Sequence, residues 1–139
     1  MTKFTMFRQD ENTQEFKKGS VIFGEGNPGD VMYVVIDGVV ELKLQGVTVN
    51  QVSADEIFGE MALVDSSPRS ATAHAVTDCK LAVVDQKRFE FVVQQTPNFA
   101  IQVMGVMADR LRKTTEISIK EKIRKVNPNI LDALFAIDE

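Results

Sequence analysis

The sequence contains one cysteine, one histidine and four prolines among 139 residues, and the first two scarcities exclude several kinds of protein. With Cys79 alone, the chain can form neither an internal disulfide nor a cysteine-rich zinc site. With His74 alone, it cannot supply the several histidines of the usual metal centres. There is no run of about 18 apolar residues, and the N-terminus lacks the charged-then-apolar pattern of a signal segment. We therefore expect a cytoplasmic protein with no metal, no cofactor and no membrane partner.

The balance of charge argues against a nucleic-acid partner. The chain is near the commonest size for one domain, and its net charge of −4 gives it no general affinity for nucleic acid. One basic stretch, residues 110–125, contains seven Lys or Arg residues and two acids. Cations near the C-terminus of a helix complement the helix dipole, so this stretch is explained without nucleic acid.

Short strands are predicted for residues 13–84, where glycines, β-branched residues and turn signals dominate. Asp37-Gly38 is suited to a tight hairpin between two of these strands, and Gln45-Gly46 to a second turn. Strands at this spacing favour an antiparallel sandwich or small barrel over a sheet built from βαβ units. The individual strands are expected at residues 20–23, 31–36, 39–44, 47–52, 71–76 and 80–84.

Helices are predicted for the remainder. Asp85 is a suitable N-cap for a helix over residues 86–95. A longer helix is expected over residues 98–125, because apolar side chains recur at three- and four-residue steps. It should end at Asn127, since the residue before a proline avoids helical angles. We expect one domain over residues 1–139, with a β-roll at about 13–84, C-terminal helices at about 86–126 and a short tail helix at about 130–137.

The segment FGEMALVDSSPRSAT, residues 58–72, carries the clearest chemistry. Gly59 would let the backbone approach a ligand closely, and a brief helix over about 60–64 would turn its positive end toward an anion. Arg69 can present a planar fork of donors to phosphate oxygens, with the Ser70 hydroxyl beside it. An ionised Glu60 accepts hydrogen bonds from sugar hydroxyls. Together these residues would hold one phosphate beside one ribose hydroxyl.

The same two charges have a structural alternative. Glu60 and Arg69 would also serve as an ion pair that holds the loop of a ligand-free roll together. A bare Gly-Glu pair would not decide between the two, but the spacing of the whole segment favours a ligand.

The order of these residues resembles the phosphate-binding cassette of cyclic nucleotide-binding domains. The resemblance rests on residues 58–63 and 68–72 and extends over most of the chain, through residues 24–30, 36–38 and 110–112. It implies a mainly β fold with C-terminal helices (α+β). In that fold an antiparallel β-roll, or jelly roll, of about eight strands carries a short cassette helix and a long C-terminal helix.

The resemblance also implies a role for each residue. Glu60 would bind the ribose 2′-hydroxyl and Arg69 would neutralise the cyclic phosphate. Gly59, Met61 and Ala62 would supply backbone amides and would cover the ligand. Ser70 and Ala71 would complete the shell of contacts around the phosphate. Phe58, Val49 and Val52 would form an apolar wall of the pocket.

Within this family the chain looks most like the bacterial cAMP receptor proteins. Thr114 and Thr115 of the long helix match hydroxyls that meet the purine edge in those proteins, with Arg110 as a weaker candidate at the same place. The two threonines would come one from each subunit of a homodimer formed through that helix, although small residues on a helix seam also serve packing alone. The resemblance favours cAMP and leaves cGMP open, because Ser70 suits both.

One feature of the bacterial receptors is missing. Their chains continue into a DNA-reading helix-turn-helix, whereas the residues after Val126 are too few for that motif. We therefore expect a stand-alone regulatory sensor that binds the nucleotide and signals, through movement of its long helix, to a separate protein.

Two rival functions belong to other classes. The first is a ligand-independent interaction or scaffold module with a vestigial pocket, which would have no need of the cassette arginine. The second is a cupin-type metalloenzyme on a similar roll, which a single histidine cannot supply with its metal ligands. No paired carboxylates and no nucleophile with a base indicate catalysis, so we expect no enzymatic activity.

Overall fold

The computed structural model describes residues 2–126 and divides the chain into two units, Met1–Met107 and Ala108–Glu139. All of the described strands belong to the first unit. The tail helix expected at residues 130–137 lies outside the described residues. In chain order the elements are η1 (Thr5–Phe7, a 3₁₀ turn), β1 (Thr13–Phe16), β2 (Val21–Phe23), β3 (Val31–Asp37), β4 (Val40–Leu44), β5 (Val47–Val52), β6 (Ile57–Phe58), α1 (Met61–Asp65), β7 (Thr72–Ala75), β8 (Cys79–Asp85), α2 (Gln86–Gln95) and α3 (Asn98–Val126).

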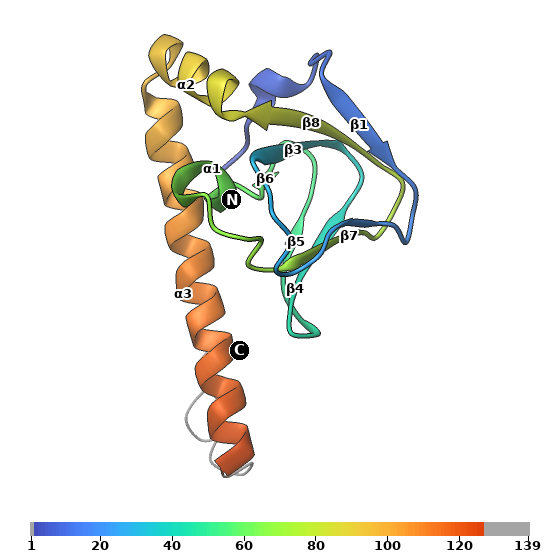
Figure 1. The fold of residues 1–139 in the computed structure, drawn as a ribbon, viewed down its shortest axis with the longest axis vertical. Coiled ribbons are helices and arrows are strands. Elements are labelled where there is room, and N and C mark those ends of the chain that lie inside the picture. Colours follow the sequence, from blue (N-terminus) through green and yellow to red (C-terminus); the bar gives the residue numbers. More distant parts are fainter. Residues whose placement is uncertain (1, 127–139) are drawn as a thin grey trace. The chain divides into compact units, whose positions relative to one another are not determined.

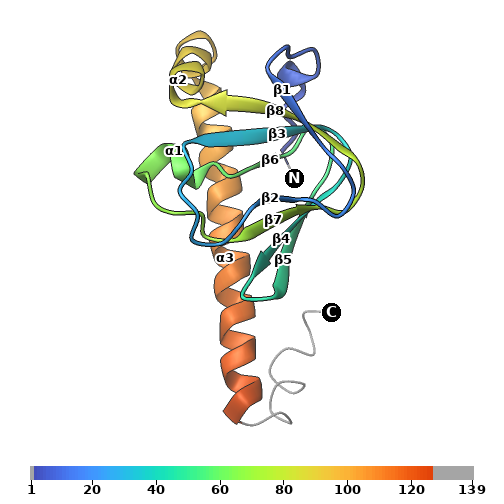
Figure 2. The ribbon, with the colours of Figure 1, turned by 45° about the vertical axis from the view of Figure 1, so that its right-hand side comes forward.

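Two four-stranded antiparallel sheets make up the β-roll, which confirms the expected fold class. One sheet has the order β1-β8-β3-β6 and the other β2-β7-β4-β5. Figure 2 shows them as two layers, with β8 and β3 in one and β2, β7 and β4 in the other. The short helix α1 follows β6, so the cassette begins where one sheet ends (Figure 1).

The turn at Asp37-Gly38 is not the hairpin that the sequence predicts. Gly38 has a φ of +99°, as such a turn would require, but β3 pairs with β8 and β6, while β4 pairs with β7 and β5. The chain therefore crosses from one sheet to the other at Gly38. The second turn is a true hairpin: Leu44 pairs with Val47, and the residues between them, Gln45 and Gly46, both have positive φ.

Strand β3 is buried on both faces, so its residues read as one apolar run rather than an alternation. Met32 and Val34 face a core that contains Val84 of β8 and Phe99 of α3. Tyr33 points the other way, because successive side chains alternate, and its ring meets Phe23 of β2 in the opposite sheet. The strand thus joins the helical core to the space between the sheets.

The helices begin where the sequence predicts. The Asp85 side chain accepts a hydrogen bond from the Arg88 backbone N–H at 2.8 Å and caps α2. The start of α3 is fixed by the fully buried Phe99, followed by Val103 and Val106 at three- and four-residue steps. The first three turns of α3 therefore belong to the core of the first unit.

The N-terminal residues, for which the sequence predicts no element, are tied down by long-range contacts. Phe4 and Phe7 are 1% exposed, and their rings lie 5.6 and 6.0 Å from that of Phe99. The Arg8 guanidinium binds both carboxylate oxygens of Asp55, with its shortest bond at 2.7 Å. Arg88 of α2 forms an ion pair with Asp10 and lies over the Phe7 ring. The segment thereby joins the loop before β6 to both helices.

The Asp55 carboxylate should make the free energy of unfolding depend on pH in the acid range. Its hydrogen bond from Arg8 holds the pKa of Asp55 below the usual value of 3.8. The ionised carboxylate therefore stabilises the fold fully above that pH, and this stabilisation is lost as the pH falls through the lowered pKa. We expect Asp55→Asn to lower the free energy of unfolding at pH 7 and the difference from wild type to shrink below pH 3.8. Denaturant unfolding at a series of pH values measures this.

Asparagine suits the comparison because it tolerates the positive φ of +69° at position 55. Asp109→Asn, at a carboxylate that is 73% exposed, is the control and should leave stability unchanged at every pH. A difference between Asp55→Asn and wild type that persisted unchanged into acid would contradict the assignment.

Candidate functional site

Arg69 is the centre of the candidate site, and it is buried. Only 6% of the residue is exposed. Nη1 donates to the Gly59 carbonyl at 3.0 Å and Nη2 to the Val31 carbonyl at 2.9 Å, while Nε is buried with no hydrogen-bond partner. Burial lowers the pKa of the guanidinium, which still stays charged at neutral pH, since arginine ionises far above it. A buried cation with an unused donor suits an anionic ligand.

Two glycines leave room for this guanidinium. A Cβ at Gly29 would lie 2.2 Å from Nε, and one at Gly59 would lie 2.8 Å from Nη1. Gly59 also has a φ of +77°, a conformation that other residues rarely adopt. The sequence predicts Gly59 as a point of close approach to a ligand, and in the structure its carbonyl and open side are in contact with Arg69 instead.

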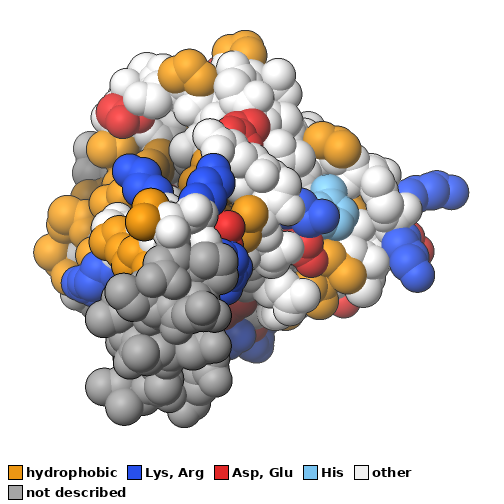
Figure 3. Space-filling model, turned by 90° about the horizontal axis from the view of Figure 1, so that it is seen from below, with side chains coloured by type: hydrophobic (Ala, Val, Ile, Leu, Met, Phe, Trp, Pro, Cys, Tyr) orange, Lys and Arg blue, Asp and Glu red, His pale blue; other side chains and the backbone are white. Residues whose placement is uncertain are grey.

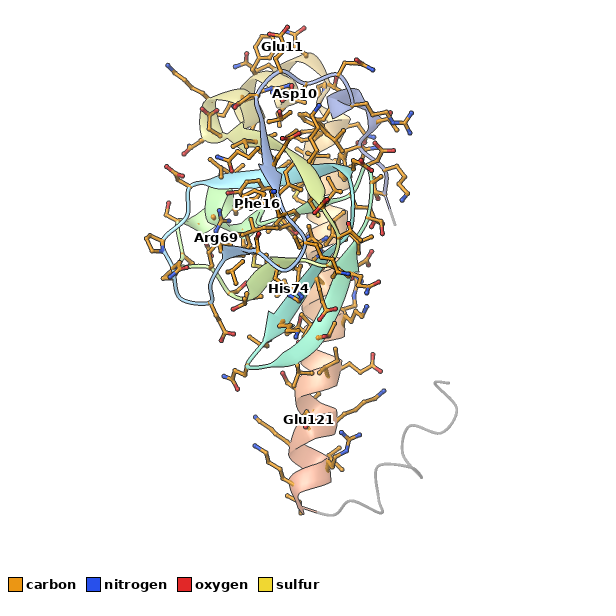
Figure 4. All side chains as sticks on the ribbon, turned by 90° about the vertical axis from the view of Figure 1, so that its right-hand side faces the viewer. Asp10, Glu11, Phe16, Arg69, His74 and Glu121 are labelled. Carbon is orange, nitrogen blue, oxygen red and sulfur yellow. The ribbon has the colours of Figure 1, made fainter. Side chains whose placement is uncertain are left out.

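The backbone of the cassette is held to the loop between β2 and β3. The Arg69 N–H donates to the Asn27 carbonyl at 2.8 Å, and the Gly26 N–H donates to the Arg69 carbonyl at 2.8 Å. The Asn27 side chain accepts from the Gly24 N–H within the same loop. Figure 4 shows Arg69 between the layers of β3 and β2, next to this loop. These bonds fix where the arginine enters the space between the sheets.

Glu60 lies at the N-cap of α1 and is 3% exposed. Its backbone is already helical, with φ −65° and ψ −27°, and its side chain does not cap the helix. It directly follows Gly59, whose carbonyl accepts a hydrogen bond from Arg69 Nη1 at 3.0 Å, and its negative charge, like that of Asp30, raises the pKa of the guanidinium against the larger effect of burial. The structure therefore brings together the two charged residues that the sequence singles out.

The remaining cassette residues differ in exposure. Ala62 is buried, Met61 and Ala71 are half-buried, and Ser70 is exposed. The three residues of the expected apolar wall are all buried, but Phe58 lies on β6 of one sheet, and Val49 and Val52 lie on β5 of the other.

The candidates on α3 belong to the second unit. Arg110 and Thr114 are half-buried and Thr115 is exposed, all within the continuous helix Asn98–Val126. Their contact with the purine stays a prediction.

Sequence reasoning missed the residues on which Arg69 rests. The guanidinium carbon lies 4.2 Å from the centre of the Phe23 ring and 5.8 Å from that of Tyr33. Both residues lie in apolar strand runs that predict core packing, and only the packing of the two sheets against each other brings their rings to Arg69. Gly29 gave a partial signal as part of the dense turn at residues 24–30.

The single histidine and the single cysteine lie outside the group of residues around Arg69. His74 is half-buried on β7, opposite Glu41 of β4, and the Cys79 thiol is buried and donates to the Val39 carbonyl. Within residues 2–126, no group of three or more His, Cys, Asp or Glu side chains is arranged to hold a metal ion.

No helix among the described residues is both long and apolar enough to cross a membrane. Figure 3 shows both Lys or Arg and Asp or Glu side chains on the face that it draws.

The fold and site together define a β-roll with a buried arginine in the segment between α1 and β7 and a buried glutamate at the start of α1. Residues 13–96 match the family model described as the cyclic nucleotide-binding domain. The chain belongs to this family.

Curated relatives are similar to most of this chain. The CRP-like cAMP-activated global transcriptional regulator of Mycobacterium tuberculosis is 26% identical over 126 residues, which is 87% of this chain and 51% of that protein. Lysophospholipase nte1 of Aspergillus oryzae is 32% identical over 109 residues, or 75% of this chain. The chain spans about half of the regulator and 7% of the lysophospholipase.

Solved structures agree with the family. The catabolite activator protein of Thermus thermophilus has a TM-score of 0.68 at 29% identity, covering 81% of this chain and 56% of that one. The EAL enzyme Bd1971 in its cAMP-bound form has a TM-score of 0.58 at 30% identity, covering 84% and 33%. The same enzyme in its cGMP-bound form has a TM-score of 0.59 at 30% identity, covering 84% and 34%.

Proposed function

We propose that this chain binds cAMP and acts as a regulatory sensor without catalytic activity of its own. The observation that carries the proposal is the buried Arg69, whose Nε has no partner, beside the buried Glu60 at the start of α1. A cyclic phosphate would supply the missing acceptor and the negative charge, and a ribose hydroxyl would donate to the Glu60 carboxylate. The similarity to a cAMP-activated regulator favours cAMP as the ligand.

The signal would leave through α3. This helix begins among the core residues Phe99 and Val103 and continues without interruption to Val126. A ligand that made better contacts with one position of α3 than with another would shift the population between them. The receiver would be a separate protein, and the apolar side chains of α3 also suit a homodimer.

One observation favours the rival scaffold function. Arg69 already donates to two carbonyls and is enclosed by Gly29, as it would be in a roll that no longer binds a ligand. Titration decides between the two functions.

Calorimetric titration of the purified protein with cAMP, cGMP and 5′-AMP tests the proposal. We expect micromolar or tighter binding of cAMP, weaker binding of cGMP and none of 5′-AMP. The open phosphate of 5′-AMP carries a second charge and lacks the ring that fixes phosphate against ribose. Absence of heat and of any thermal shift with both cyclic nucleotides would reject the sensor and leave the scaffold function.

A further inference from the structure

We propose that the aromatic cluster formed by Phe23, Tyr33 and Phe58 positions the Arg69 guanidinium through its ring faces, and that Phe23 thereby sets the affinity of the site for a phosphate. This inference rests on the proposed function, because it concerns how that site holds its anion. Phe23 and Tyr33 are positioning residues, since they act on the ligand through Arg69.

The geometry is that of a cation resting on stacked rings. The guanidinium carbon lies 4.2 Å from the centroid of Phe23 and 5.8 Å from that of Tyr33, both within the range of a cation–π contact. The Phe23 and Tyr33 rings are stacked with centroids 6.2 Å apart, and Tyr33 stacks on Phe58 at 5.1 Å. Phe23 and Phe58 lie 5.9 Å apart, which closes the cluster. Each ring is therefore held by the other two.

The cluster joins the two sheets at this point. Phe23 ends β2 of one sheet, whereas Tyr33 and Phe58 pair with each other on β3 and β6 of the other. Phe58 is fully buried and Tyr33 is 8% exposed, so neither can move without disturbing the core. Burial also raises the pKa of Tyr33, which keeps its phenol neutral beside the cation.

Arg69 needs such a support because its burial is poorly compensated by hydrogen bonds. The acceptors of its terminal nitrogens are two carbonyls, which carry dipoles but no charge, and Nε has none. The negative faces of aromatic rings attract a cation most when water is excluded, as it is at a residue 6% exposed. The rings thus help to keep the guanidinium in place without occupying any of its N–H donors.

This arrangement prepares Arg69 for an anion. A long arginine side chain loses conformational entropy when a ligand fixes its rotamer. A guanidinium that is already held in place loses less of this entropy when the ligand binds. A ring contact uses none of the N–H groups of the guanidinium, so the Nε–H remains available for a hydrogen bond to a phosphate oxygen. Loss of the Phe23 ring should therefore weaken binding, although Phe23 itself makes no hydrogen bond to the ligand.

The test is a series of fluorinated phenylalanines at position 23, with cAMP affinity measured by calorimetry. Fluorine withdraws electron density from the ring face and leaves its shape almost unchanged, so affinity should fall stepwise from one to three fluorines. Phe23→Leu should weaken binding about two- to thirtyfold. Affinity that stayed level or rose along the fluorine series would overturn the proposal.

Phe16→Leu provides the matched control. Phe16 is also half-buried, but it lies away from Arg69. It pairs with Cys79 at one end of β8, whereas Val31, whose carbonyl accepts a hydrogen bond from Arg69, pairs with Asp85 at the other end. It should bind cAMP as wild type does. A loss equal to that of Phe23→Leu would show that general loosening of the roll is responsible and would also overturn the proposal.

A ligand-free measurement separates this proposal from the proposed function. The Arg69 Nε–H resonance in a ¹H–¹⁵N spectrum should be shifted upfield by the Phe23 ring current, and should move to its ordinary position in Phe23→Leu. If wild type does not bind cAMP, the sensor function fails and this spectrum alone decides the positioning role. An Nε–H resonance that Phe23→Leu leaves unchanged would reject that role whatever the protein binds.

Discussion

Replacing Arg69 with leucine should weaken cAMP binding by roughly tenfold to a hundredfold or more. A hydrogen bond to a charged group contributes about 1.5–3 kcal/mol, and each 1.4 kcal/mol is a factor of ten in the dissociation constant. The loss should be this large because Arg69 is buried, so the screening that weakens exposed ion pairs is reduced. Calorimetric titration of the variant beside wild type measures the effect.

Leucine at position 69 also has a structural consequence that must be measured separately. It leaves the Gly59 and Val31 carbonyls without their donor, but it removes a cation whose burial is unfavourable. Thermal unfolding without ligand shows whether the roll is intact. Arg124→Leu, at an arginine of α3 that is 55% exposed, should leave affinity unchanged. An Arg69→Leu protein that unfolds like wild type and binds cAMP equally well would remove Arg69 from the site.

The β-roll was predictable where local sequence determines local structure. The Gln45-Gly46 turn and the Asp85 cap each depend on a few adjacent residues, and both form as expected. The partner of a strand is not a local property. Asp37-Gly38 predicts a turn correctly, but whether the next strand stays in the same sheet depends on β8, about forty residues further along.

Two elements were too short to be recognised. β6 has two residues and η1 has three, so neither shows a periodicity. What holds them is distant in the chain: β6 pairs with β3, and η1 is followed by an arginine that binds Asp55, 47 residues away. Their stability comes from tertiary contacts, which a single sequence does not display.

In the candidate site, too, local sequence predicts some of the residues, whereas others are revealed only by tertiary contacts. Glu60 and Arg69 were found because a charge among small and apolar residues is unusual, and the structure buries both. Phe23 and Tyr33 were not found because aromatic residues in apolar strands are ordinary core residues. Their second role appears only when β2 and β3, from different sheets, bring their rings under one guanidinium.

Replacing Phe99 with alanine should lower the free energy of unfolding by about 3–5 kcal/mol, the usual effect of removing a fully buried aromatic ring. Phe99 is 0% exposed, and its ring contacts those of Phe4, Phe7 and Phe89 at 5.4 to 6.0 Å. These neighbours come from the N-terminal segment and α2, so the cavity would lie where both meet α3. The melting temperature should fall by roughly 10 to 20 °C.

The size of this effect depends on whether the cavity stays open. Phe91→Ala removes the same side chain from α2, where it is 60% exposed, and should change stability by about 0.5 kcal/mol or less. If the two variants were equally stable, the N-terminal segment would have to close over the space that Phe99 leaves, and its contacts would not be a fixed part of the core. The Arg8–Asp55 and Arg88–Asp10 pairs oppose such closure, because both tie down the chain directly after Phe7. We therefore expect a cavity that persists and a variant much less stable than Phe91→Ala.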